Sequence, residues 1–367
     1  MAKLSLPELQ AAVSSIVTTA KLSNATFSVT RDNMVGLLDK IGKIVTLDSV
    51  FTIDKLSGFD GEYLSFGKTI EEWQQDLIMP VAKDDSGATT LAPHEPTYRP
   101  VFYSYTIGKK VIPTTIRNND IERAVHFQDQ FISIVAMQYK RLEDSMAQYR
   151  YQVKREIIGK FYNLCEATLP ANVSAYVATT AYSVGTLAKN SSEVGICVKA
   201  KDTTNITWAN AVAGGYFVVL NLITAIAKPV DTSTGEAFLI QVKEDVEVAS
   251  DVSEGHSLNG NTLGATEGLV LIVKQGIMPN LEVNTQAGAF HLEKVAIPTE
   301  VIVVKDFGSA TDPYAVLMDR RAFRLHNTYN AVRDQVNAQG DFLNVYRHTE
   351  DTAYISRNAF VKFYKAV

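Results

Sequence analysis

The longest uninterrupted pattern in the chain covers residues 118–158, which contain neither proline nor glycine. Apolar residues recur there at steps of three and four, and this spacing draws one apolar stripe along a helix. The stripe consists of Ile132, Val135, Tyr139, Leu142, Met146, Tyr149, Val153 and Ile157. Because the stripe loses phase at residues 126–129, we predict a short helix followed by a main helix over residues 128–162. At 1.5 Å per residue the main helix is about 50 Å long, which exceeds the width of most globular domains.

Charged residues occupy the opposite face of this predicted helix. They are Lys140, Arg141, Glu143, Asp144, Arg150, Lys154 and Arg155. The basic residues near the carboxyl end suit the negative pole of the helix dipole. Asn119 and Glu122 have the spacing of an N-terminal cap, and Gly159 lies near the other end, where glycine often terminates a helix.

The composition of the chain argues against several classes of protein. A length of 367 residues predicts two or more lobes, and a composition with 46% hydrophobic and 20% charged residues is typical of a globular protein. A net charge of −5 argues against a dedicated nucleic-acid binder, so any contact with DNA is expected to be weak and local. Cys165 and Cys197 are too few for a disulfide framework or a zinc site, and they fit a reducing compartment. Pro7, Glu8 and Gln10 interrupt any apolar signal-peptide core, so no export signal is expected.

Residues 69–112 are predicted to form a long β-hairpin. Residues 69–79 lead out, a stretch with several prolines forms the distal part, and residues 101–112 return. The return arm carries more apolar surface than a two-stranded ribbon keeps in water. Either the chain's own core or a neighbouring subunit must therefore cover it, and we favour the neighbour. The candidate interface residues are Trp73, Phe102, Tyr103, Tyr105 and Ile107.

A second lobe is predicted to begin at residue 169, where the sequence becomes rich in small residues. Its buried strands are expected in four apolar runs, at residues 194–199, 238–242, 269–273 and 301–304. Residues 208–227 contain no charged side chain, and the asparagines and glycines among them favour a buried helix over a membrane span. Residues 249–267 are dense in Gly, Ser, Asn and Thr, which indicates a long polar loop.

The last part of the chain is predicted to form a β-hairpin and a closing strand. Residues 323–329 and 342–347 are its arms, with a turn near residues 337–341 and a second, polar turn at residues 348–351. The alternating residues 358–364 are expected to close a sheet beside the long helix.

No chemical motif in the sequence is complete. Residues 61–69 resemble a phosphate-binding loop, but five residues separate the glycines where that motif has four. The six histidines are scattered without the paired spacing of metal ligands on a helix. His348, Glu350 and Asp351 offer cation ligands, yet such residues in a turn are usually only solvated. We therefore predict no catalytic, cofactor-binding or metal-binding residues.

Four segments follow one another in a distinctive order along the chain. They are residues 107–113 leading into Asp120-Ile121-Glu122, the helix end at Ile157-Ile158-Gly159, residues 315–323, and residues 357–361. Together with an N-terminal arm over residues 1–50, the predicted hairpin and the long helix, this order resembles the major capsid proteins of tailed double-stranded DNA bacteriophages, which have the Hong Kong 97-like fold. The resemblance covers nearly the whole chain and rests on the order of parts.

The resemblance implies an α+β subunit with five parts. Residues 1–50 would be an N-terminal arm, and residues 51–113 the extended hairpin region. Residues 114–168 would form the spine helix of a peripheral domain that also holds a β-sheet. Residues 169–310 would form a mixed α/β axial domain, and residues 311–367 would return to the peripheral domain.

The resemblance also implies a structural role without catalysis. The chain would assemble with itself into pentamers and hexamers of an icosahedral phage head that encloses the double-stranded DNA genome. Scaffold, portal and minor capsid proteins are further expected partners, with weak contact to packaged DNA and none to a membrane. The protein would belong to the virion after assembly in the host bacterial cytoplasm. The alternatives are an encapsulin-like compartment shell and, from another class, a nucleotide-binding enzyme that uses residues 61–69.

Overall fold

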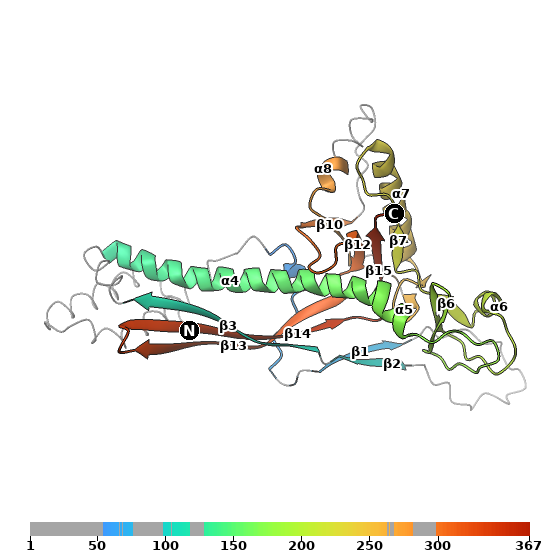
Figure 1. Ribbon diagram of the computed structural model, residues 1–367, viewed down its shortest axis with the longest axis horizontal. Helices are drawn as coiled ribbons and strands as arrows, with labels where there is room; N and C mark the ends of the chain where they lie inside the picture. Colours follow the sequence, from blue (N-terminus) through green and yellow to red (C-terminus); the bar gives the residue numbers. More distant parts are fainter. Residues whose placement is uncertain are drawn as a thin grey trace, which may run out of the picture.

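The computed structural model describes residues 54–65, 67, 69–75, 98–103, 105–117, 128–262, 264, 268–281 and 299–367. The molecule is elongated: one long helix runs beside a sheet, and a second sheet rises from the carboxyl end of that helix (Figure 1). The predicted arm at residues 1–50, the short helix at residues 119–125 and the distal part of the hairpin lie outside the described residues.

The long helix is α4 (Gln128–Asn163), so the predicted main helix is confirmed. Of the stripe residues whose side chains are described, Leu142, Met146 and Ile157 are buried, and Tyr149 and Val153 are partly buried. The helix passes through a π-helical turn (Leu164–Thr168) into α5 (Leu169–Asn172).

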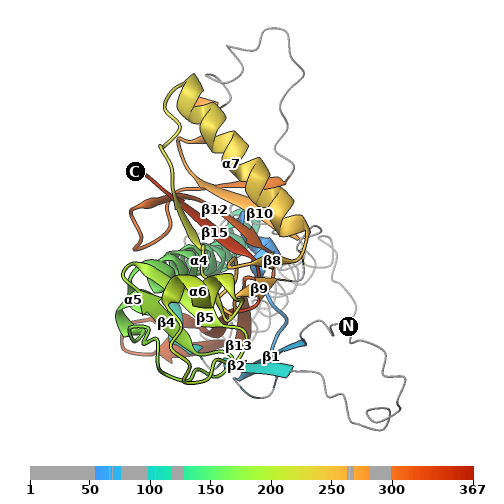
Figure 2. The ribbon, with the colours of Figure 1, turned by 90° about the vertical axis from the view of Figure 1, so that its right-hand side faces the viewer.

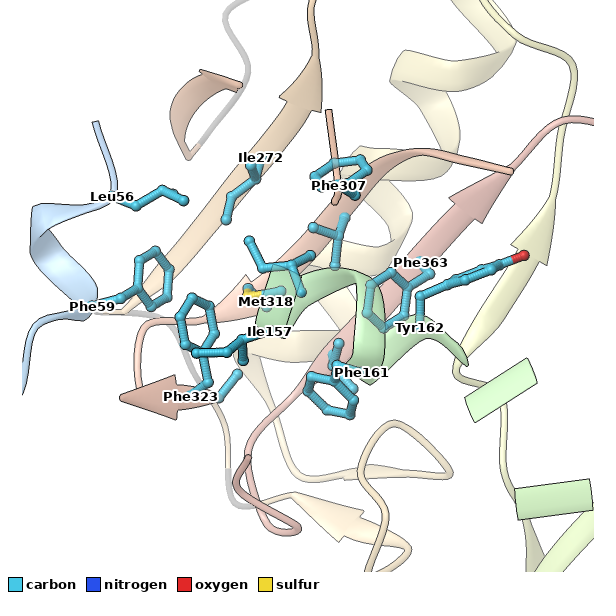
Figure 3. Close-up of a cluster of buried hydrophobic side chains, with 14 of the residues drawn as sticks. Leu56, Phe59, Ile157, Phe161, Tyr162, Ile272, Phe307, Met318, Phe323 and Phe363 are labelled. Carbon is cyan, nitrogen blue, oxygen red and sulfur yellow. The ribbon is translucent and has the colours of Figure 1, made fainter. Parts of the chain in front are cut away.

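Two charged residues of α4 are buried, which the helical periodicity does not indicate. Lys154 has no exposed surface and Arg155 is 9% exposed, although both lie between stripe positions. The reason is that the carboxyl end of α4 is covered on several sides. Ile158, Phe161 and Tyr162 of this helix end belong to a buried apolar cluster, and Figure 3 labels Phe161 and Tyr162 within it.

Gly159 lies within α4 and does not terminate it. A Cβ atom at this position would lie 2.1 Å from the carbonyl oxygen of Phe307, so only glycine lets the two backbones approach this closely. The prediction that Gly159 caps the helix is therefore wrong, because the residue serves a packing contact between distant segments.

The first sheet has the strand order β13-β14-β3 and lies along α4. Its strands are β3 (Tyr105–Arg117), β13 (Phe323–Asn337) and β14 (Phe342–Ile355), all antiparallel. The predicted hairpin with a turn near residues 337–341 is confirmed. The predicted polar turn at residues 348–351 is wrong, because β14 continues through it to Ile355 with buried side chains.

The second sheet has the order β11-β10-β12-β15-β7. Its strands are β7 (Ile223–Ala225), β10 (Leu269–Lys274), β11 (Glu300–Val304), β12 (Pro313–Asp319) and β15 (Val361–Lys365). Helix α7 (Thr232–Ser250) lies across β10, β12 and β15 in Figure 2. Alternate residues serve opposite faces: Leu271 and Leu317 pack with α7, whereas Ile272 and Met318 pack toward α4.

One of two expectations about this sheet needs correction. Residues 238–242 are the buried face of α7 and not a strand, because a short apolar run fits both structures equally well. The predicted closing strand is confirmed: β15 pairs with β12 and β7, and its Phe363 packs against Phe161 and Tyr162 of the long helix at 5.6 and 5.4 Å between ring centroids. Strands β12 and β15 thus lie in one sheet with β10 and β11.

A smaller lobe surrounds the sheet β4-β5-β6. Its elements are β4 (Leu187–Asn190), β5 (Glu193–Cys197), α6 (Trp208–Ala213) and β6 (Phe217–Val219). The predicted long helix at residues 208–227 is wrong: α6 stops before Gly214 and Gly215, and two short strands follow. Among the described residues, no helix combines the length and the apolar character needed to cross a membrane.

The remaining described elements are short. They are a 3-10 helix (Ser57–Phe59), β1 (Ile70–Gln75), β2 (Tyr98–Tyr103), β8 (Ser253–Glu254), β9 (Asn261–Thr262) and α8 (Met278–Asn280). The 3-10 helix is tied to the sheet by Phe59, whose ring stacks on Phe323 with centroids 4.4 Å apart.

Candidate assembly interface

The base of the predicted hairpin is a two-stranded antiparallel ribbon of β1 and β2. Ile70 lies opposite Tyr103, and Trp73 lies opposite Pro100. Trp73 is 61% exposed, the largest aromatic surface among the described residues. An exposed aromatic side chain on an outlying ribbon is typical of a protein interface. The side chains of Phe102, Tyr103 and Tyr105 lie outside the described part of the chain, so their assignment to an interface stays a prediction.

The return arm of the predicted hairpin belongs to two strands, β2 and β3. Its second half is β3, which pairs with β14 from Tyr105 to Arg117 and is an edge strand of the three-stranded sheet. Ile107 is partly buried and packs against the main core of the subunit. The expectation that the whole return arm lacks a third strand is therefore wrong, and the subunit itself covers at least part of Ile107.

A hydrogen bond between distant residues fixes the base of the hairpin. The Ser356 hydroxyl donates to Glu72 Oε1 at 2.6 Å, and the two residues are 284 positions apart in the chain. Ser356 is 1% exposed, and its oxygen also accepts from the backbone amides of Asn358 and Ala359, each at 3.1 Å. The strand that leads into the hairpin is thus anchored where β14 ends. Sequence reasoning missed this pair because nothing local marks either residue.

Buried ion pairs connect the segment before the hairpin with α4. The Lys154 ammonium lies 2.7 Å from Asp54 Oδ2 and 2.8 Å from Asp60 Oδ1. Arg150, one turn earlier, lies 3.1 Å from Asp60 and 3.8 Å from the buried carboxylate of Asp351. A charge without solvent contact is tolerated only when it is paired, so these carboxylates account for the burial of Lys154.

The glycine-containing stretch at residues 61–69 does not form a phosphate cradle. The Gly61 amide donates to the Leu325 carbonyl and the Leu64 amide donates to the Asn327 carbonyl, both at 2.9 Å. These amides therefore pair with β13 and are not directed at an anion. The His326 ring also covers Gly61, since a Cβ atom there would lie 2.3 Å from it. A nucleotide-binding enzyme is not favoured.

The residues considered as cation ligands are used within the sheet. Asn327 donates its side-chain amide to Asp351 Oδ1 at 3.1 Å and to the Glu350 carbonyl at 3.2 Å. Glu350 and Asp351 are 7% and 1% exposed, so they lie inside the subunit and not in a solvated turn. The described part of the chain contains no group of three His, Cys, Asp or Glu residues arranged to hold a metal ion.

The predicted polar loop that follows α7 is largely buried, and His256 connects it to β15. The imidazole stacks on the Phe360 ring at 5.3 Å between centroids, and the His256 carbonyl accepts the amide of Val361 at 3.0 Å. Burial lowers the pKa of His256 below its ordinary value of 6.5, and the charge of Lys362 lowers it further, whereas Asp245 opposes this. Lys362 is itself buried and donates to the Asn221 carbonyl at 2.9 Å.

We expect the free energy of unfolding to fall as the pH is lowered from about 7 to about 5. The unfolded chain protonates residue 256 at a higher pH than the folded chain does. The contribution of His256 is therefore complete above the unfolded pKa and is lost as the pH falls through the folded pKa. His256→Gln should flatten this dependence in urea titrations at several pH values, and His348→Gln is the control. If the free energy of unfolding changed equally with pH in the wild type and in His256→Gln, the prediction would be contradicted.

Comparisons with known proteins agree with this architecture. The sequence matches the model of a family described as Phi29-like phage major capsid protein over residues 5–363. The fold is similar to a chain in the capsid structure of Staphylococcus phage Andhra, with 11% identity, a TM-score of 0.55, and coverage of 87% of this chain and 84% of that one. It is also similar to a chain in the structure of the head fiber and inner core protein gp22 of native bacteriophage P68, with 11% identity, a TM-score of 0.53, and coverage of 84% and 83%. No curated protein matches the sequence.

Proposed function

This chain belongs to the Phi29-like phage major capsid protein family, and from that premise we propose that its hairpin fastens neighbouring subunits of the shell together. The protein is a capsid subunit with the Hong Kong 97-like fold that forms icosahedral shells. Such a subunit works through its surfaces, so the question is which surfaces hold the shell together.

The shell is proposed to consist of pentamers and hexamers around the double-stranded DNA genome. With a net charge of −5, a subunit neutralises few phosphates, so its contact with packaged DNA is weak. Scaffold, portal and minor capsid proteins are proposed as further partners, and the host bacterial cytoplasm as the place of assembly. The role is structural, without catalysis.

The exposure of Trp73 supports the proposed role of the hairpin. This side chain lies on the short ribbon of β1 and β2, which is too small to bury a tryptophan by itself. The hydrogen bond from Ser356 to Glu72 also anchors the ribbon to the end of β14. A rigidly directed aromatic side chain suits insertion into a neighbouring subunit, because little conformational entropy is lost on binding.

Trp73→Ser is expected to leave a folded subunit that assembles poorly. A buried aromatic anchor contributes about 2 kcal/mol or more to an interface, and this loss is repeated in every subunit of the shell. Circular dichroism should report normal helix content, and sedimentation should report a reduced assembled fraction. Tyr63→Ser is the matched control, because Tyr63 is 57% exposed but lies before the hairpin. Shells at normal yield from Trp73→Ser would show that this side chain does not fasten the subunits.

Electron microscopy of particles, combined with their absorbance ratio at protein and nucleic-acid wavelengths, tests the wider proposal. Icosahedral particles rich in nucleic acid are expected from infected cells. Particles that hold protein and no nucleic acid would instead indicate a compartment of the encapsulin type.

A further inference from the structure

Within the described part of the chain, backbone covers the outer edge of β13 only near its start. Asp60 forms a parallel bridge with Leu325, and the amides of Gly61 and Leu64 donate to carbonyls of β13. After residue 64 the chain turns away toward β1, which pairs with β2. The first part of this edge therefore already pairs with an extended segment of backbone.

The rest of the same edge is open in the described part of the chain. Residues 329–337 pair with β14 on one side, and no described strand pairs with them on the other. Most of these nine residues are exposed. In an antiparallel strand every second residue directs its N–H and C=O away from the partner, so about four residues present unpaired backbone groups. The open edge is about 30 Å long.

The opposite edge of this sheet, formed by β3, is protected against the addition of a strand. Strand β3 carries Lys109, Lys110 and Pro113, residue types that discourage the addition of another strand. Residues 329–337 contain no lysine, proline or glycine, and Arg333 and Asp334 cancel in charge. Unprotected edges of this length are normally avoided in soluble proteins, because they pair with other chains.

Two apolar side chains on the open edge offer further contact. Val332 and Val336 are 47% and 37% exposed. They lie on the same face of the sheet, opposite Arg347 and Leu343 of β14. A strand added beside β13 would place its own side chains next to these two valines.

We propose that residues 329–337 of β13 accept a strand from a neighbouring copy of this chain, which adds a fourth strand to the sheet. The proposal rests on the capsid function, since a shell places copies side by side and each copy carries one such edge. The charge pattern is compatible with a copy, because an edge without net charge does not repel a chain of net charge −5. Backbone pairing provides the affinity and the valines provide the register.

Hydrogen exchange of residues 329–337 in free subunits and in shells tests the proposal. The amides that pair with β14 should be protected in both states. About four further amides should exchange rapidly in free subunits and about a hundredfold more slowly in shells. Cross-linking mass spectrometry on the same shells should connect this edge to a second copy. Unchanged exchange in intact shells would overturn the edge pairing while leaving the capsid function standing. Protection with cross-links only to a different protein would overturn the assignment to a copy.

The double variant Val332→Lys with Val336→Lys provides a second test. Lysines on a strand edge discourage pairing, so the shell yield should fall by about tenfold or more, while the free subunit melts at an unchanged temperature. The control is Val111→Lys on the protected edge, since Val111 is 45% exposed. A normal yield from the double variant would overturn the proposal. The exchange measurement on the wild type decides the matter if the double variant does not fold.

Discussion

Lys154→Ala is expected to lower the free energy of unfolding by about 3 kcal/mol. The ammonium is fully buried between Asp54 and Asp60, and its removal leaves two carboxylates without their closest cation. We expect a loss in the lower part of the range that is typical when one partner of a buried ion pair is removed. The reasons are that Asp60 is 31% exposed and that Arg150 still lies 3.1 Å from it. Urea denaturation followed by circular dichroism measures the loss.

Lys140→Ala is the matched control, because Lys140 is an exposed lysine of the same helix. Its effect should be within about 0.5 kcal/mol of zero. Asp54→Ala combined with Lys154→Ala should cost less than the sum of the two single changes, because the pair is then removed together. Equal effects of Lys154→Ala and Lys140→Ala would mean that the ion pairs contribute nothing to stability.

Leu142→Asp is expected to cost about 4 kcal/mol or more, because it places a carboxylate in an apolar contact. Leu142 is 4% exposed and lies on the stripe of α4, which runs along the sheet of β3 and β14. Such a loss is comparable with the whole stability of many domains, so little folded subunit should remain. The yield of soluble protein and its thermal melt measure the effect.

Arg141→Asp controls for the added charge, because the neighbouring Arg141 is exposed. This variant should fold normally and lose only a few tenths of a kcal/mol. A soluble Leu142→Asp subunit with an unchanged melting temperature would mean that the stripe is not a buried surface.

Much of the architecture could be predicted because its signals are local. The main helix, the hairpin of β13 and β14, and the strands β10 and β11 all follow from apolar patterns within one segment. The order of these parts was enough to indicate the fold. The interface prediction was less complete. Trp73 is exposed as an interface residue requires, whereas Ile107 packs on its own subunit.

By itself, the sequence determined which segments are helices or strands wherever a single apolar face repeats over many residues. Only the tertiary structure decided which segments meet, because that depends on partners far away in the chain. Lys154 is buried because the carboxylates of Asp54 and Asp60 pair with its ammonium. Strand β15 pairs with β12 and β7, which are distant from it in the chain. The same holds for the edge of β13 that no described strand covers. Gly61 and Leu64 pair with its first part, and the local pattern of residues 329–337 does not indicate where that pairing stops.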